Sequence, residues 1–299
     1  MFLGTGNSCF INGNFYASAE WAYICTSIFI MRKYLMLLVA LCSLSAAHAQ
    51  LFKLKKPILS GIYVQWGYNR DWFTKSDIHL SDGKNYDFTV HKAYAKEQPD
   101  FSGFRDAPLD ITIPQNSYRI GFYLNPEHTH AIEINFDHAK YVVEDYQTLR
   151  ISGHINGREI DKDTMITKDF LHFEHTNGAN FYHINYVHQQ AVWHNPKRTL
   201  ATVLYKLGGG IVVPRSDVTV MGQELDNKYH VAGYIFSAEA GTRIYPLKNL
   251  FFEVNLKGGF ANYLNVLTVG SEGKAHHHFW YGEVIGLVGY DINFRKVRN

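Results

Sequence analysis

Catalytic chemistry in this 299-residue chain is most readily assigned to the triplet His175-Thr176-Asn177. A threonine hydroxyl becomes a nucleophile when a histidine lies within hydrogen-bond reach, which makes His175 and Thr176 candidate catalytic residues. Neighbouring residues of a β-strand point to opposite faces, so His175 and Thr176 would diverge on a regular strand. The triplet therefore makes catalysis a hypothesis, and whether the protein is an enzyme stays open.

The histidines form a second candidate site. Imidazole is the commonest transition-metal ligand, and three or four converging side chains would bind Zn or Cu. The candidates gather at one end of the strands that the sequence predicts: His138, His172, His230, His276 and His278. However, no tight ligand spacing supports a metal site, and the run 276–278 would alternate between two faces of a strand. We therefore expect polar strand-end residues and no cofactor, with a metal-binding rim as the alternative.

Charged residues form the third set, because many of them recur at every second position of apolar segments. The segment 252–257 is an example, in which apolar and polar side chains take turns. Alternation with a period of two is typical of a strand with water on one side only. Buried charges must pair, since unpaired buried ions are costly. We expect an interior charge network made of Arg119, Glu133, Asp137, Lys206, Glu239, Arg243, Glu253, Lys257, Glu283 and Asp291.

Eight alternating segments would position these charges. In chain order they are 62–69, 118–124, 132–137, 182–186, 201–207, 232–243, 252–257 and 280–294. Long strands with charge on their inner face indicate an all-β protein, an eight-stranded antiparallel transmembrane β-barrel. All eight prolines fall outside or at the edge of these segments, as a closed hydrogen-bond ladder requires. A barrel of this size is just wide enough to be filled by side chains, so we expect no pore.

Two alternatives to this fold stay open. In a ten-stranded barrel, 86–95 would cross as well, followed by a long connection at 96–108 and a stunted strand at 109–113. A soluble β-sandwich or lipocalin-like barrel would invert the alternation and bury the apolar face. Tryptophan and tyrosine gather near both ends of the apolar faces, which favours contact with lipid.

Short turns are predicted at one end of the barrel and long loops at the other, the asymmetry of outer-membrane barrels. The longest loops are 70–115 and 139–178. Asp82-Gly83 and Asn156-Gly157 predict a β-hairpin in each of them. Such loops could present binding surfaces to an extracellular ligand.

The first 49 residues are not expected in the mature protein. Residues 31–49 combine a basic start, a short apolar run and Ala47-His48-Ala49, the pattern of a secretory signal peptide. Residues 1–30 are interpreted as a mis-assigned gene start, which leaves 50–299 as a single barrel domain. All three cysteines fall in the removed part, which excludes disulfide and thiol chemistry. The net charge of +2 gives no reason to expect nucleic acid as a partner.

With this pattern, and with the segment Phe-Glu-His-Thr-Asn-Gly-Ala-Asn at 173–180, the mature chain resembles the small eight-stranded outer-membrane proteins of Gram-negative bacteria. The resemblance implies export by the signal peptide and contact with outer-membrane lipid. The last strand ends at Phe294 and is similar to the aromatic-ended signal read by the barrel-insertion machinery, although five residues follow it. The triplet at 175–177 distantly resembles the His-x-Ser-Asn motif of lipid A deacylases and acyloxyacyl hydrolase barrels, one residue shorter and with Thr for Ser. This resemblance implies Asn177 as the third candidate catalytic residue.

The leading hypothesis is therefore a non-enzymatic outer-membrane β-barrel that has a side-chain-filled interior. Its long loops would bind a ligand outside the cell or contribute to envelope integrity. An outer-membrane lipid hydrolase and a His-rich metal-binding rim are the alternatives.

Overall fold

The computed structural model describes residues 59–98, 115–175, 178–226 and 228–294. All of them belong to one compact unit, Pro57–Asn299, and the regular elements of this unit are β-strands. The predicted signal peptide, the stunted strand at 109–113 and the candidates Thr176 and Asn177 lie outside the described residues. No helix in the described ranges is long and apolar enough to cross a membrane.

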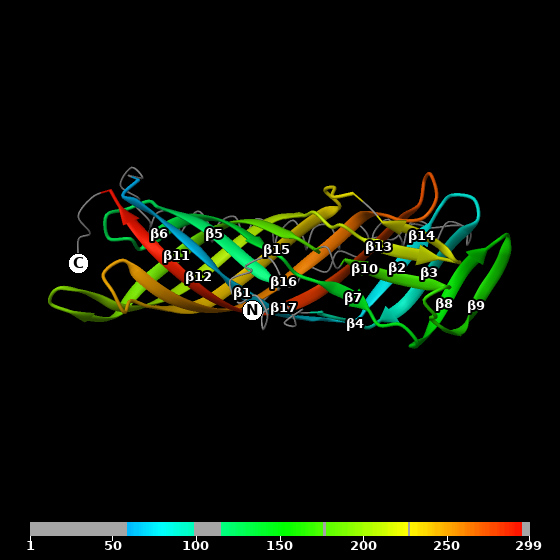
Figure 1. Ribbon diagram of the computed structural model, residues 1–299, viewed down its shortest axis with the longest axis horizontal. Helices are drawn as coiled ribbons and strands as arrows, with labels where there is room; N and C mark the ends of the chain where they lie inside the picture. Colours follow the sequence, from blue (N-terminus) through cyan, green and yellow to red (C-terminus); the bar gives the residue numbers. More distant parts are fainter. Residues whose placement is uncertain (1–58, 99–114, 176–177, 227, 295–299) are drawn as a thin grey trace, which may run out of the picture. The chain divides into compact units, whose positions relative to one another are not determined.

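Eight strands pair edge to edge in an antiparallel ring (Figure 1). In the order of the ring they are β1 (Gly61–Phe73), β5 (Asn116–Tyr123), β6 (His130–Asp137), β11 (Phe181–Asn195), β12 (Arg198–Val212), β15 (Gly233–Ile244), β16 (Leu250–Leu267) and β17 (Lys274–Asn293). The ring closes because β1 also pairs with β17, in register from Gly61↔Asn293 to Phe73↔Tyr281. Closure leaves no free strand edge in the ring. The predicted eight-stranded antiparallel barrel is confirmed, with each predicted segment inside or overlapping one of these strands.

The two faces of the ring differ as the alternation predicts. Apolar side chains such as Ile184, Leu207 and Leu256 are exposed on the outside, whereas the intervening Asn185, Lys206 and Asn255 are buried inside. An apolar exterior with a polar interior is the arrangement of a transmembrane β-barrel and the inverse of a soluble sandwich.

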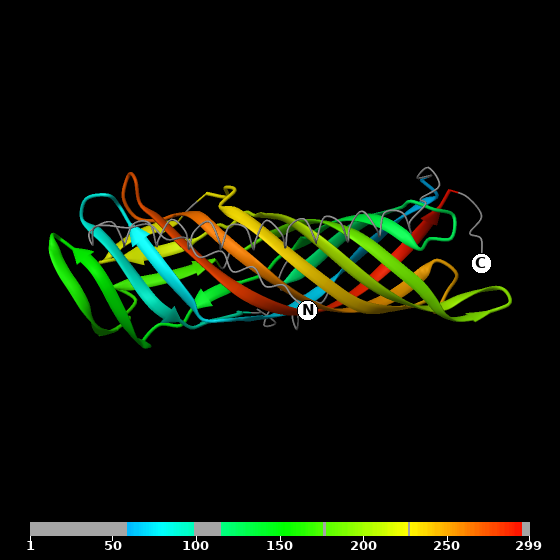
Figure 2. The ribbon, with the colours of Figure 1, turned by 180° about the vertical axis from the view of Figure 1, so that it is seen from behind.

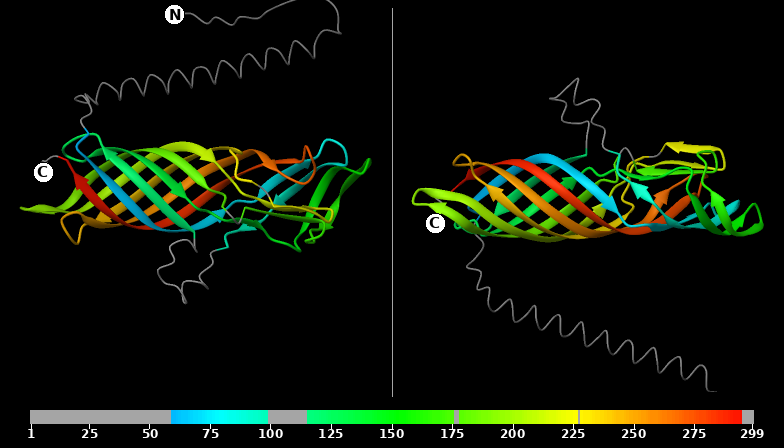
Figure 3. Two further views of the ribbon diagram at one scale, coloured as in Figure 1. Left: turned by 45° about the horizontal axis from the view of Figure 1, so that its top comes forward. Right: turned by 90° about the horizontal axis from the view of Figure 1, so that it is seen from below.

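The long connections fold into further sheets at one end of the barrel, opposite the β11–β12 hairpin (Figures 2 and 3). We refer to them together as the distal sheets. One extends from the start of β17 through β2 (Ser76–Ser81), β3 (Tyr86–Ala93), β8 (Thr148–Ile155) and β9 (Arg158–Met165). The other runs in the order β14 (Gln223–Asp226), β13 (Asp217–Val220), β10 (Leu171–His175), β7 (Tyr141–Val143) and β4 (Ala95–Lys96).

This arrangement corrects one prediction. The ten-stranded alternative is wrong, because β3 does not join the ring: it pairs with β2 and β8 in the distal sheets. The segment alternates as a barrel strand would, but its apolar face is buried in a distal core and does not face outward.

Both predicted hairpins are present. Asn156 and Gly157 have φ angles of 50° and 74° at the β8–β9 turn, the left-handed pair that a two-residue turn of type I′ requires. At the β2–β3 turn, Oδ1 of Asp82 accepts hydrogen bonds from the backbone N–H groups of Asn85 and Tyr86, at 2.7 and 3.0 Å. These contacts satisfy backbone donors that the turn removes from the ladder.

An apolar core lies between the two distal sheets and continues into the adjoining end of the barrel. Its largest fully buried members are Phe88, Tyr141, Phe173, Phe181, Tyr263 and Phe279. Burial of this surface from water drives the packing of the two sheets. The open edge of the larger sheet, β9, is covered with charged side chains (REIDKDTM), which discourage pairing with another chain.

Candidate functional site

The centre of the barrel is occupied by ion pairs, and Lys206 on β12 is their hub. Its Nζ lies 2.9 Å from Glu133 Oε2 and 2.9 Å from Glu253 Oε1, and 3.7 Å from Glu239 Oε2. These acids come from β6, β16 and β15, so one lysine links four strands of the ring. The side chains of Lys206, Glu133 and Glu253 are 0 % exposed.

Arg119 and Lys257 extend the network toward the distal sheets. Nη1 of Arg119 lies 2.7 Å from Glu239 and 3.2 Å from Glu133, and its Nη2 lies 3.7 Å from Asp137. Lys257 contacts Asp137 and lies 2.9 Å from Glu283. Lys206, Arg119 and Lys257 therefore each have at least two carboxylate partners, which offsets the cost of removing their charge from water.

Arg243 extends the network toward the other end of the barrel. Its Nε and Nη2 reach Glu253 Oε2 at 2.8 and 2.7 Å, a charge-assisted contact. Its Nη1 donates to the hydroxyl of Tyr123, which in turn donates to Asp291 at 2.8 Å. The guanidinium also lies 4.0 Å from the ring centroid of Phe251. The structure thus brings all ten predicted interior residues into one buried region, with Asp291 joined through a tyrosine.

Further polar residues belong to this network and were missed by the sequence reasoning. Asn69 lies within hydrogen-bond distance of Asp71 and Glu283, and Gln115 donates to Asp71 and Glu97 at 2.7 and 3.0 Å. Asp71 shares the inward parity of Asn69 on β1. A predicted first strand that continued to 73 would have placed Asp71 among the inward-facing charges.

Apolar side chains close the barrel interior at both ends. Toward the short turns lies a cluster of Tyr63, Tyr123, Ala131, Val187, Tyr245 and Phe251. Toward the distal sheets lies the larger core described above. The ion pairs and the two apolar clusters together occupy the barrel interior with buried side chains.

The candidate base His175 lies in the distal core on β10. Its Nδ1 lies 2.7 Å from Ser216 Oγ, and its Nε2 lies 3.2 Å from Nε2 of His277. The ring of Tyr263 stacks on it, with 5.0 Å between centroids. Burial lowers the pKa of His175 to about 3, which keeps the imidazole neutral. Ser216 sits in the loop before β13, and no sequence signal marks it as a neighbour of His175.

The five metal candidates do not converge. His138 bonds Asn180, His230 bonds the carbonyl of Asn265, and His276 and His278 lie beside different rings. His172 lies between Asp145 at 3.0 Å and Glu174 at 3.2 Å. Within the described ranges, no three His, Cys, Asp or Glu side chains are grouped as metal ligands.

His172 is instead a charged group with two partners. The pKa of His172 is raised to about 9, chiefly by the hydrogen bond to Glu174. Burial of the ring lowers this pKa, and the hydrogen bond to Asp145 raises it further. Both ring nitrogens are engaged, so the imidazolium joins β10 to the loop that carries Asp145. This contact is structural and leaves no lone pair for a metal.

No protein-family model matches the sequence, and no curated protein matches it either. Among solved structures, the chain is similar to Neisserial surface protein A (9 % identity, 77 % of this chain and 96 % of that chain, TM-score 0.32). It is also similar to the attachment invasion locus protein Ail of Yersinia pestis in complex with sucrose octasulfate (8 %, 79 % and 100 %, 0.34). A third similar structure is the outer membrane protein OprG from Pseudomonas aeruginosa (9 %, 81 % and 100 %, 0.35). Because these TM-scores are low, the fold assignment rests on the strand pairing described above.

Proposed function

We propose that this chain is an outer-membrane β-barrel protein of a Gram-negative bacterium, exported by an N-terminal signal peptide and inserted by the barrel-insertion machinery. Its distal sheets would lie outside the cell, where they bind a ligand or contribute to envelope integrity. The barrel would act as a plugged, non-enzymatic anchor.

The outer surface of β16 and β17 supports this placement. Phe260 pairs with Trp280, and two residues further along the strands toward the distal sheets Asn262 pairs with His278. Trp280 is 63 % exposed. Aromatic side chains mark the membrane–water interface in barrels, so the change from Trp280 to His278 gives the level at which the lipid would end.

The observation that carries the proposal is the plugged interior. Lys206 and its carboxylate partners fill the barrel centre with groups that are 0–1 % exposed. Such an interior suits an anchor better than a channel. Refolded protein in planar bilayers is therefore expected to give no stable conductance steps; steady single-channel currents would contradict the proposal.

Surface labelling tests the orientation. Arg158→Cys lies at the tip of the β8–β9 hairpin, and Lys197→Cys lies at the exposed β11–β12 turn. On intact cells, a membrane-impermeant maleimide is expected to label the first variant and not the second, and both after lysis. The opposite pattern would reverse the orientation, and equal protection of both would contradict insertion in the outer membrane.

A lipid hydrolase is a second candidate, because one observation favours it. The 2.7 Å contact between His175 and Ser216 has the geometry of a base beside a nucleophile. Against it, both side chains are buried, at 0 and 1 % exposure, so a substrate would need an opening in the distal core. We expect lipid A from cells that express Ser216→Ala or His175→Ala to show the wild-type acylation pattern by mass spectrometry. Loss of a deacylated species in both variants would favour the hydrolase.

A further inference from the structure

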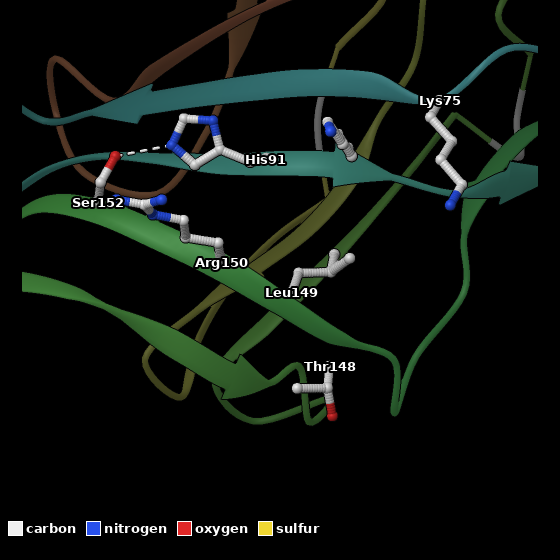
Figure 4. A pocket seen from close by; sticks show the side chains of 7 residues that line it. Lys75, His91, Thr148, Leu149, Arg150 and Ser152 are labelled. Carbon is white, nitrogen blue, oxygen red and sulfur yellow. Dashed lines mark hydrogen bonds between the residues drawn. The ribbon is translucent and has the colours of Figure 1, made fainter.

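A basic pocket of about 500 Å³ opens on the solvent-facing side of the larger distal sheet (Figure 4). Its lining comes from the β1–β2 link, the end of β3 and the start of β8: Lys75, His91, Lys92, Thr148, Leu149, Arg150 and Ser152. Three of these side chains are cationic, and two more carry hydroxyl groups. Among these described lining residues none carries a carboxylate, so the pocket offers hydrogen-bond donors with positive charge.

Neighbouring acids hold part of this lining in place. Asp161 accepts hydrogen bonds from Nε and Nη2 of Arg150, each at 2.8 Å. Asp77 Oδ1 accepts from the backbone N–H of Lys92 at 2.7 Å, and Asp77 Oδ2 lies 3.7 Å from His91 Nδ1. His91 Nε2 in turn lies 2.7 Å from Ser152 Oγ, as Figure 4 shows. These two acids fix the Arg150 and His91 side chains, while no ion pair holds the ammonium groups of the two lining lysines among the described contacts.

The position of the pocket along the barrel axis indicates which part of the membrane it would face. Thr74 donates its backbone N–H to the carbonyl of Trp280 at 2.9 Å, and Lys75 follows directly. Trp72 and Trp280 are 57 % and 63 % exposed on the outside of the barrel. Because tryptophan marks the membrane interface, Lys75 stands at the level of the outer-leaflet headgroups.

We propose that this pocket binds a phosphate group of an outer-leaflet lipid headgroup, a step that rests on the membrane placement proposed above. A phosphate accepts charge-assisted hydrogen bonds from ammonium and guanidinium groups and neutral ones from hydroxyl groups. The ammonium groups of Lys75 and Lys92 supply the charge, and Thr148 and Ser152 supply the hydroxyl donors. The lipid is held at the rim of the barrel beside the distal sheets.

The test compares two double variants that remove the same charge. Lys75→Gln/Lys92→Gln empties the pocket of its ammonium groups, whereas Lys84→Gln/Lys274→Gln removes two exposed lysines near the tip of the sheet. Native mass spectrometry of detergent-refolded protein measures retention of diphosphorylated lipid A and of its dephosphorylated form. We expect wild type and the tip variant to retain the phosphorylated lipid, and the pocket variant to bind it about tenfold more weakly.

Equal retention by the pocket variant, or equal retention of the dephosphorylated lipid, would overturn the inference. Calorimetry with inorganic pyrophosphate forms the second arm, since it needs no membrane. Pyrophosphate binding that is lost in the pocket variant, together with no lipid retention, would assign a soluble phosphate as ligand and overturn the lipid. If surface labelling showed wrong placement while pyrophosphate still bound in the pocket, the proposed function would fail and the phosphate chemistry would stand.

Discussion

The barrel and the distal sheets use the same alternation with opposite polarity. In the barrel half of β17, Glu283 points inward and Val284 outward; in the distal half, Phe279 points inward and His278 outward. One strand of 20 residues therefore changes its buried side-chain type without changing its parity. The polarity of an alternating strand is set by what lies outside it, hydrocarbon in one half and water in the other.

This difference explains how each region is stabilised. In the barrel, hydrocarbon outside would take the place of an apolar core, so the interior can hold ion pairs such as Lys206–Glu133. In the distal sheets water is outside, and stability comes from the burial of side chains such as Phe88 and Phe173. Substitutions of the same chemical kind should then have unequal effects in the two regions.

Removing the hub of the ion-pair network should have the largest effect. Lys206→Met leaves Glu133 and Glu253 with one buried cation fewer, and removal of one partner from a buried ion pair costs about 3–5 kcal/mol. Urea unfolding of protein refolded in lipid measures the free energy of unfolding. Leu207→Met, on the outward face of the same strand, is the control that should change little. Wild-type stability in Lys206→Met would mean that the network does not hold the barrel together.

Charge on the outside of the barrel should have the next largest effect. Val254→Arg and Val284→Arg, at outward sites that are 56 % and 37 % exposed, should each cost about 2–4 kcal/mol near the bilayer centre. Glu159→Arg, on the exposed edge of β9, should stay within about 0.5 kcal/mol of wild type. Refolding titrations in lipid that gave equal losses at 254 and 159 would remove the contrast between the two regions.

The substitution Ile151→Val, which removes one methyl group from the distal core, should cause a smaller and local loss of stability. Ile151 on β8 is fully buried there, and an Ile→Val change costs about 0.5–1.5 kcal/mol. Hydrogen exchange should show faster exchange in β3 and β8 and unchanged protection in β12 and β16. Thr89→Ser, on the opposite face of β3, is a control. Uniform loss of protection would mean that barrel and distal sheets unfold as one unit.

The smallest predicted effect concerns pH. The pKa of His172 is raised to about 9 when folded, chiefly by its hydrogen bond to Glu174, above the ordinary value of about 6.5. The contribution of protonated His172 to folding stability is therefore fully present below a pH of about 6.5 and is lost as the pH rises through 9. Proteolysis of the distal sheets should accelerate across this range in wild type. The acceleration should be smaller in His172→Gln, and an identical pH profile in both would exclude this contact as the cause.

The barrel could be predicted from sequence because its strands are long and its alternation covers many positions. The second distal sheet could not, because β7 and β13 have only 3 and 4 residues, too few for a period to be recognised. Local turn chemistry did predict the hairpins at Asp82-Gly83 and Asn156-Gly157. The contact between His175 and Ser216 joins two separate connections through tertiary packing, so no spacing rule reveals it.

The continuity of β17 has a mechanical consequence. Its first residues pair with β2 in the distal sheets, and its last residues pair with β1 and β16 in the ring. Tension applied to β2 would pass into the barrel through β17 as well as through the loops that join the two regions, and the ladder hydrogen bonds of β17 would be loaded in shear. If the distal sheets bind a ligand as proposed, a pull on that ligand would reach the barrel without a hinge in β17.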